Sequence, residues 1–328
     1  MSSVVAPIAA AAGPHVAGIL AEVESGLRTH VAPGTGALPG AGLASITAGG
    51  KRLRPLLTTV AAGPAAIEDP SPARAAVVRA GIAVELTHTA SLIHDDVLDA
   101  GGLRRGRPTT FASDGRAAAT CLGDALFGSA FAVLSDGAAG PGPVRILAEA
   151  SRALAEGELV QRAEAWRTDL DEQQYLARCE LKTSALFDAA ARLGALAAGE
   201  DPDSFASFAR SLGLAFQLFD DVLDVVASPD QTGKPRGSDI LDGTATLPLL
   251  YAREQDAELA SLDMRSVTTH EAAAEICDRI AATGATERTE QRARELVQEG
   301  VATLPTGLDE ARSAAFALMA HGVVNRRL

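Results

Sequence analysis

The chain has few aromatic residues and few cysteines. Its 328 residues include nine Phe, two Tyr, one Trp and three Cys. β-Sheets favour aromatic and β-branched residues, so this composition argues against a β-sandwich or barrel. The cysteines, Cys121, Cys179 and Cys277, lie far apart and match no zinc-binding spacing, and so sparse a count is typical of a reducing compartment. We therefore expect a cytoplasmic protein whose thiols act as small core residues.

Positive charge is scarce as well. Lys and Arg together number 29 against 42 Asp and Glu, which gives a net charge of −13. A negative surface repels nucleic acid and anionic lipid, so nucleic acid is excluded as a general partner. No uncharged apolar run of about 18 residues occurs, and no Lys or Arg precedes Arg28, so the sequence predicts neither a membrane-spanning helix nor a signal peptide. We expect residues 1–15 to form a disordered tail.

Apolar residues recur at helical spacing along most of the chain, and short stretches of Gly, Pro and Asp separate these segments. Alanine and leucine, which are common in them, favour helices. No alternating strand pattern of useful length occurs, and no linker divides the chain. The sequence therefore predicts an all-α fold in a single domain over residues 1–328. We expect long helices over 73–99, 117–134, 144–167, 175–198 and 204–226, and shorter ones from residue 243 onward.

The pentapeptide DDVLD occurs twice, at residues 95–99 and 220–224, each time at the end of an apolar helical segment. Residues four apart share one face of a helix, so the first and last aspartates of each copy lie together. Paired carboxylates repel each other unless a cation lies between them, and Mg²⁺ binds hard oxygen ligands together with substrate phosphates. A single acidic helix end could equally be a solvated surface, but two copies of the motif favour a metal site.

Basic residues are gathered near these motifs. Residues 49–55 read GGKRLRP, and Arg104 and Arg105 follow the first aspartate motif. A guanidinium group can bind a phosphate through two parallel hydrogen bonds. His88 lies about two helical turns before Asp95 and shares its face of the helix. In an acidic protein, this arrangement predicts a site for a diphosphate substrate.

The chain resembles the trans-isoprenyl diphosphate synthases of the polyprenyl synthetase family from about residue 49 to its C-terminus. Seven motifs carry the resemblance together, and the set is far more specific than one aspartate motif alone. They are GGKRLRP (49–55), HTASLIHDDVLD (88–99), LRRGRPT (103–109), GDAL (123–126), LKTSALF (181–187), FQLFDDVLD (216–224) and GKPRGSDI (233–240). The resemblance implies a helical bundle around a central cavity, the isoprenoid synthase-like fold, and usually a homodimer.

The resemblance also implies a reaction and the residues that perform it. An allylic diphosphate ionises, isopentenyl diphosphate attacks the resulting carbocation, and a proton is lost. About three Mg²⁺ ions would be held by Asp95, Asp99 and Asp220. Isopentenyl diphosphate would be bound by Lys51, Arg54, His88 and Arg105. The allylic substrate would contact Arg104, Lys234 and three catalytic residues, Lys182, Thr183 and Gln217.

Three residues near the first aspartate motif bear on the length of the product. In the family, positions one to two turns before that motif form the floor of the tunnel that holds the growing prenyl tail. Here they are Thr87, Ala90 and Ser91, which are all small. A large aromatic residue there would stop growth early, so we expect a product longer than fifteen carbons, most readily geranylgeranyl diphosphate. Phe127 and Phe131 are candidates for the eventual floor.

The sequence departs from the family pattern in two of its polar motifs. The usual GKxTLP reads GTATLP at residues 243–248, so Thr244 replaces a lysine that binds diphosphate. We expect this change to weaken binding of the allylic substrate. The usual GQxxD appears as Gly157-Glu158 with Gln161. Neither change removes a metal ligand.

Two alternatives remain from the sequence alone. A class I terpene cyclase or an irregular coupling enzyme has the same fold, but a cyclase needs no second diphosphate site, and Lys51, Arg54 and Arg105 indicate one. A non-catalytic subunit of a heteromeric synthase typically loses its aspartate motifs, and both motifs are intact here.

Overall fold

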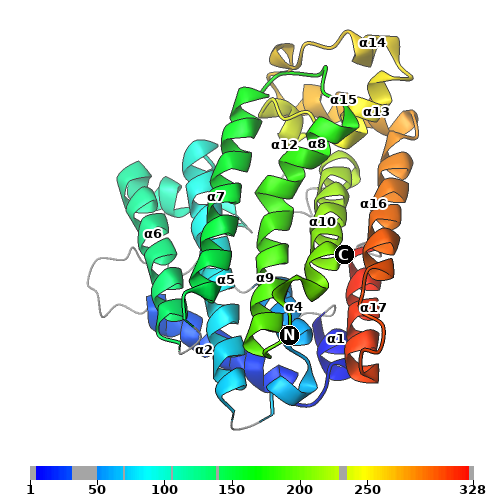
Figure 1. The fold of residues 1–328 in the computed structure, drawn as a ribbon. Helices are drawn as coiled ribbons and strands as arrows, with labels where there is room; N and C mark the ends of the chain where they lie inside the picture. The colour runs from blue at the N-terminus through cyan, green and yellow to red at the C-terminus, as the bar shows by residue number, and fades with distance from the viewer. Residues whose placement is uncertain are drawn as a thin grey trace. The chain divides into compact units, whose positions relative to one another are not determined.

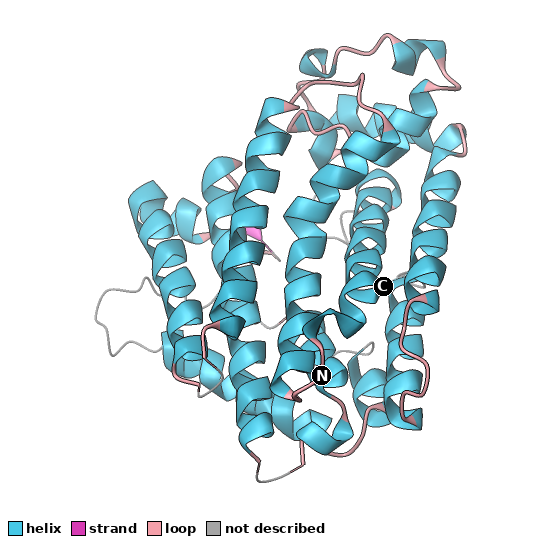
Figure 2. Cartoon of the chain, viewed as in Figure 1, coloured by secondary structure: helices cyan, strands magenta, loops and turns pink. Residues whose placement is uncertain are grey.

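The computed structural model describes residues 5–31, 50–68, 71–104, 106–137, 140–228 and 235–324. Within these ranges the chain is almost entirely helical, as Figures 1 and 2 show. The strands found there are two short segments, β1 (Leu103–Arg104) and β2 (Arg107–Pro108), which pair antiparallel. The predicted all-α fold is confirmed.

The chain divides into two compact units, which are described separately. Unit 1 contains Met1–Arg152, Leu186–Ala209 and Thr303–Met319, and unit 2 contains Ala153–Ala185, Arg210–Ala302 and Ala320–Leu328. Each unit is therefore built from segments that are distant in the sequence. The single domain expected from the sequence stays a prediction.

Unit 1 is centred on helix α5 (Pro72–Leu98), which packs along α6 (Thr110–Ser135). The same helix also contacts α2 (Val16–Val31) and α4 (Leu53–Ala62). α5 begins where the Ser71 side chain accepts a hydrogen bond from the backbone N–H of Arg74. A serine N-cap followed by proline at the first helical position favours a helix start. The observed bounds agree closely with the predicted helix over 73–99.

Unit 2 is built around α10 (Ala206–Val226) and a set of shorter helices toward the C-terminus. α10 and three other helices, α7, α9 and α17, contribute residues to both units. In unit 2, α13 contacts α14 and α16, and α15 contacts α12 and α16. The bounds of the helices not yet given are α7 (Gly142–Ala163), α8 (Glu172–Cys179), α9 (Ala185–Ala197), α12 (Ser238–Leu241), α13 (Leu247–Arg253), α14 (Ala257–Ala260), α15 (His270–Ala282), α16 (Ala285–Ala302) and α17 (Glu310–Val324). Short helical turns lie at Pro64–Ala66, Pro202–Phe205 and Met264–Ser266, and a π-helical turn, η3, lies at Glu180–Ser184.

The N-terminal segment differs from the expected disordered tail. Val5–Ala11 forms helix α1, and its side chains Val5, Ile8 and Ala9 are buried in unit 1. Their spacing of three and four residues gives the helix one apolar face, which explains why it packs. The expectation of a disordered tail over residues 1–15 is therefore wrong for the residues of α1.

Two helices, α5 and α6, are long and apolar enough to cross a membrane by length and composition alone. The apolar window of α5 is 67% buried inside the protein, and that of α6 is 39% buried. Neither helix contains an uncharged apolar run of 18 residues, because Glu85 interrupts the stretch in α5 and Asp124 the stretch in α6. For α5, the burial is that of a core helix, and long core helices commonly have this composition.

Candidate active site

The first aspartate motif lies at the C-terminal end of α5 in unit 1. Asp96 is 7% exposed, and the Arg104 guanidinium donates from Nε to its Oδ1 at 2.9 Å. Burial raises the pKa of Asp96, although the Arg104 contact lowers it. Asp95 is half-buried and Asp99 is exposed. The middle aspartate therefore anchors the hairpin that carries Arg104, while the outer two, predicted to bind metal, reach the surface.

The GGKRLRP motif contains an anchor that the sequence did not single out. Arg52 has a left-handed backbone with φ of 51°, which costs a non-glycine residue about 1–2 kcal/mol. Its guanidinium donates to Glu24 at 2.9 Å and to Glu85 at 2.6 Å, and Glu85 is 4% exposed. A buried carboxylate needs a paired cation, so the lone Glu85 in the apolar middle of α5 was the signal for this contact. Arg52 thus fixes the start of α4 between Lys51 and Arg54.

Four residues are predicted to bind isopentenyl diphosphate, and two of them, Lys51 and Arg54, are close to this anchor in the sequence. The Arg54 guanidinium lies 4.5 Å from the ring centroid of Phe187, a cation–π contact within unit 1. Lys51 and His88 are half-buried. Arg105 is outside the described residues. Phe187 belongs to the LKTSALF motif, so this motif also helps to orient Arg54.

The second aspartate motif lies on α10 in unit 2. Asp221 is 3% exposed and accepts a hydrogen bond from the Tyr175 hydroxyl at Oδ2. Its Oδ1 accepts a second bond, at 2.8 Å, from the Gln217 amide. Burial raises the pKa of Asp221 to about 7, against the lowering effect of both hydrogen bonds. Asp220, the predicted metal ligand, is half-buried, so the middle aspartate is again the one that anchors its surroundings.

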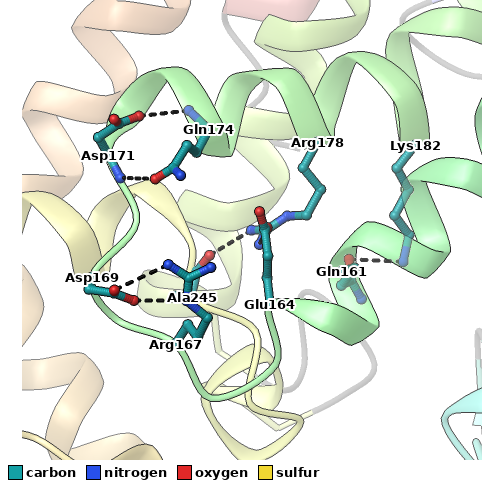
Figure 3. Close-up of polar contacts among 9 residues, drawn as sticks. All are labelled: Gln161, Glu164, Arg167, Asp169, Asp171, Gln174, Arg178, Lys182 and Ala245. Atoms are coloured by element: carbon teal, nitrogen blue, oxygen red, sulfur yellow. Dashed lines mark hydrogen bonds and ion pairs between the residues drawn. The ribbon is translucent and has the colours of Figure 1, made fainter.

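Two predicted catalytic residues lie in the π-helical turn η3. Such turns are rare and are often found at functional sites. Thr183 donates from its hydroxyl to Gln217 Oε1 at 2.7 Å, which brings these two predicted residues together. Lys182 donates from Nζ to Glu158 at 2.6 Å and to Gln161 at 3.0 Å; Figure 3 shows the bond to Gln161. Thr183 and Gln217 are thus in contact within unit 2, while Lys182 has other partners, and the catalytic roles of all three stay predictions.

Two glycines let neighbouring helices approach η3 closely. A Cβ atom on Gly157 of α7 would lie 2.7 Å from the backbone nitrogen of Lys182. A Cβ atom on Gly213 of α10 would lie 2.7 Å from Cα of Ser184. Real Cβ atoms do not approach a backbone so closely, so any side chain at either position would push its helix away from η3.

The departure from the GQxxD motif retains its chemistry. The family pattern offers one amide and one carboxylate, three residues apart, and this chain offers Glu158 and Gln161 in the reverse order. Both side chains accept a hydrogen bond from Lys182. The lysine therefore still has one charged and one neutral acceptor.

Thr244, which replaces a lysine of the family pattern, lies in a firmly held turn of unit 2. The Trp166 backbone N–H donates to the Gly243 carbonyl at 2.7 Å, and the Arg178 guanidinium donates to the Ala245 carbonyl at 2.7 Å. Figure 3 shows Arg178 between Glu164 and Ala245. The Thr244 side chain is half-exposed. Lys234, the other basic residue expected near here in sequence, is outside the described residues.

The residues predicted to set product length lie on α5. Thr87 and Ala90 have no exposed surface, and Ser91 is half-buried. On α6, Phe127 and Phe131 are both half-buried. All five belong to unit 1.

The donors of the two aspartate motifs fit Mg²⁺ by their chemistry. In the part of the chain that the structure describes, no three His, Cys, Asp or Glu side chains form a ready-made metal cluster. Mg²⁺ does not require one, because it binds through one or two carboxylates, several waters and the phosphates of a substrate. Asp95, Asp99 and Asp220 supply hard carboxylate oxygens of this kind.

Comparison with known proteins identifies the family. The chain matches the Polyprenyl synthetase family over residues 40–282. Octaprenyl diphosphate synthase of Escherichia coli is 33% identical over 291 residues, which cover 86% of this chain and 87% of the relative. Geranylgeranyl diphosphate synthase of Methanosarcina mazei is 36% identical over 240 residues, with 70% and 72% covered.

A solved structure agrees with this family. The crystal structure of polyprenyl synthase from Caulobacter crescentus, complexed with calcium and isoprenyl diphosphate, has a TM-score of 0.84 and 32% identity, and 98% of both chains is covered. The chain belongs to the polyprenyl synthetase family. It is a prenyltransferase that makes trans-prenyl diphosphates from isopentenyl and allylic diphosphates, and the family in general depends on Mg²⁺.

Proposed function

We propose that this enzyme extends an allylic diphosphate beyond fifteen carbons and that geranylgeranyl diphosphate is its main product. The observation that carries the proposal is the row of small residues Thr87, Ala90 and Ser91 on α5, next to the first aspartate motif. None of these side chains is large enough to stop a prenyl tail that runs along this helix toward its N-terminus. The C20 product is the first one beyond the fifteen-carbon length.

In this proposal, Lys51, Arg54, His88 and Arg105 bind isopentenyl diphosphate. Arg104, Lys182 and Lys234 bind the allylic diphosphate through charge-assisted hydrogen bonds. About three Mg²⁺ ions, held by Asp95, Asp99 and Asp220, would neutralise charge on the leaving diphosphate when bound.

The chain's own groups surround the reacting carbons. The Thr183 and Gln217 oxygens face the allylic carbocation and favour its positive charge, and the apolar walls exclude water that would quench it. The proton released after condensation passes to the departing diphosphate. No side chain needs to form a covalent bond with the substrate.

We also propose a cytoplasmic homodimer. The apolar window of α6 is 39% buried, and exposed small residues on the same helix, such as Ala117, Ala125 and Ala132, leave room for close approach of a second copy. Ala125→Lys should convert the dimer to a monomer in light scattering, while Ala163→Lys, at the end of α7, should not. A wild-type protein that is monomeric at micromolar concentration would refute this part.

A product assay separates the proposed function from its alternatives. Purified protein is incubated with Mg²⁺, isopentenyl diphosphate and one allylic primer at a time, and the products are sized by mass spectrometry. An elongating synthase yields longer diphosphates. A terpene cyclase would release a hydrocarbon or alcohol without consuming isopentenyl diphosphate, and a non-catalytic subunit would yield no product.

A further inference from the structure

We propose that Tyr175 is a positioning residue for prenyl transfer, which acts by fixing the orientation of Gln217 and Thr183. The inference rests on the proposed function, where these two side chains face the reacting carbons. Tyr175 is 1% exposed, so it is no candidate for a direct substrate contact. Its hydroxyl donates to Asp221 instead.

The four residues come from two helical segments of unit 2. Tyr175 and Thr183 lie on α8 and η3, and Gln217 and Asp221 lie one turn apart on α10. In an uninterrupted α-helix, positions eight apart differ by about 80° in direction, so residues 175 and 183 would diverge. The wider turn of a π-helix takes up an additional residue and reduces this offset. η3 therefore explains how both side chains reach the same helix.

The hydrogen bonds among these four residues have a defined direction. Gln217 donates from its NH₂ group to Asp221 Oδ1, so its carbonyl oxygen faces Thr183 and accepts from that hydroxyl. The Thr183 hydroxyl proton is used in that bond, at 2.7 Å. Its oxygen lone pairs stay available for a positively charged carbon.

The Tyr175 hydroxyl determines which oxygen of Asp221 accepts from Gln217. It occupies Asp221 Oδ2, which leaves Oδ1 for the Gln217 amide. Without the hydroxyl, the buried carboxylate can rotate to satisfy both oxygens, and the Gln217 amide loses its fixed direction. Thr183 is then free to turn its proton toward the carbocation, which disfavours that charge. Removing the hydroxyl should therefore slow the chemical step and leave substrate binding unchanged.

The test is Tyr175→Phe, alone and combined with Thr183→Val. The single-turnover rate constant of condensation is measured with enzyme in excess, because product release often limits steady-state turnover. We expect Tyr175→Phe to lower this constant about ten-fold, with the KM of both diphosphates within about two-fold of the wild-type value. Thr183→Val should cost about ten-fold in the wild type but less than about three-fold in Tyr175→Phe. If the rate losses of the two single variants simply multiplied in the double variant, the proposal would be overturned.

The chain offers a matched control in Tyr251, its other tyrosine. Tyr251 also donates to a carboxylate in unit 2, Glu172, at 2.6 Å. Tyr251→Phe should leave the single-turnover rate constant unchanged. Thr183→Val should therefore cost the same factor in the Tyr251→Phe protein as in the wild type. If it slowed condensation as much as Tyr175→Phe, the loss would reflect any tyrosine–carboxylate bond, and the proposal would be wrong.

A second measurement serves if Tyr175→Phe does not fold. In the Tyr251→Phe protein, Tyr175 is the sole tyrosine and can be labelled as 3-fluorotyrosine. Thr183→Val should then shift its ¹⁹F resonance, and an unmoved resonance would overturn the proposal. Failure of the proposed role of Thr183 at the reacting carbons is distinguishable, because Thr183→Val would then have no effect on the single-turnover rate constant even in the wild-type background.

Discussion

The ammonium group of Lys182 lies 2.6 Å from a carboxylate oxygen of Glu158, at the position where the family pattern has a glutamine. Glu158 therefore competes with an incoming diphosphate for this lysine. Gln161 offers the same lysine a neutral acceptor at 3.0 Å. The exchanged pair keeps the chemistry of the motif but places the charge on the other residue.

Replacing the competing carboxylate should strengthen binding of the allylic substrate. Glu158→Gln leaves Lys182 with two neutral acceptors, so we expect the allylic KM to fall several-fold, as for a half-buried ion pair of about 1 kcal/mol. The double variant Glu158→Gln with Gln161→Asp restores the family order and should return KM to near the wild-type value. Equal KM values in all three proteins would refute competition by Glu158.

The aspartates that are predicted to bind Mg²⁺ should be essential for turnover. Asp95→Ala and Asp220→Ala each remove a carboxylate that would hold the Mg²⁺ ions, whose positive charge would neutralise the leaving diphosphate, so we expect about a hundred-fold loss of kcat or more. Circular dichroism should show the helices intact. Asp136→Ala, at the exposed C-cap of α6, is the control and should retain full activity. Near-normal turnover of either variant would remove that aspartate from the metal site.

The lysine that Thr244 replaces can be restored. The backbone around Thr244 is held by Trp166 and Arg178, so a lysine there should not disturb the turn. One charge-assisted contact contributes about 1.5–3 kcal/mol, so Thr244→Lys should lower the allylic KM by about ten-fold. Thr244→Gln, which adds length without charge, is the control. An unchanged KM would mean that other cations already compensate; Arg326 and Arg327, the candidates for this role, lie outside the described residues.

The glycine on α10 should be needed for the shape of η3. Gly213→Ala places a methyl group against the backbone of Ser184, and we expect a loss of about 1–3 kcal/mol in the free energy of unfolding together with a lower kcat. Gly142→Ala at the start of α7 is the control, because its methyl group would lie 3.5 Å from Cδ2 of Leu196, an ordinary van der Waals distance. This control should leave kcat and the free energy of unfolding, measured by urea titration, close to their wild-type values. If Gly213→Ala were as stable and active as the wild type, neither stability nor turnover would depend on close packing of α10 against η3.

Product length should respond to a large side chain on α5. Ala90 has no exposed surface, so Ala90→Phe must displace whatever occupies the neighbouring space. We expect products of fifteen carbons or fewer, with condensation retained. Ser91→Ala is the control and should leave the product unchanged. An unaltered product in a folded Ala90→Phe protein would show that the tail does not pass this residue.

Periodicity in the sequence predicted the long helices well, because their apolar faces and caps are local features. The predicted helix over 73–99 and the observed α5, Pro72–Leu98, differ by one residue at each end. The π-turn η3 was not predictable from local pattern, since it depends on the close approach of Gly157 and Gly213 from other helices. α1 was missed because so short an apolar face does not by itself indicate a packed helix. Its burial depends on the other helices against which it packs.

The site showed a similar division. Lys182, Thr183 and Gln217 could be named from their motifs. Within unit 2, Lys182 donates to Glu158, and a separate set of hydrogen bonds links Thr183 and Gln217 to Asp221 and Tyr175. Glu158 and Asp221 also lie in motifs, although their contacts could not be predicted, whereas Tyr175 lies outside every motif and had no pattern to mark it. Arg52 was assigned to the basic cluster, and only its contacts with Glu24 and Glu85 distinguish it as an anchor.

The most direct test of the account uses the wild-type enzyme with farnesyl diphosphate as its sole allylic primer. This primer already has fifteen carbons, so only a synthase that extends beyond that length can convert it into a longer diphosphate. With Mg²⁺ and isopentenyl diphosphate, we expect geranylgeranyl diphosphate to be the main product by mass spectrometry. If farnesyl diphosphate were left unconsumed while shorter primers were extended to fifteen carbons, the proposed product length would be wrong.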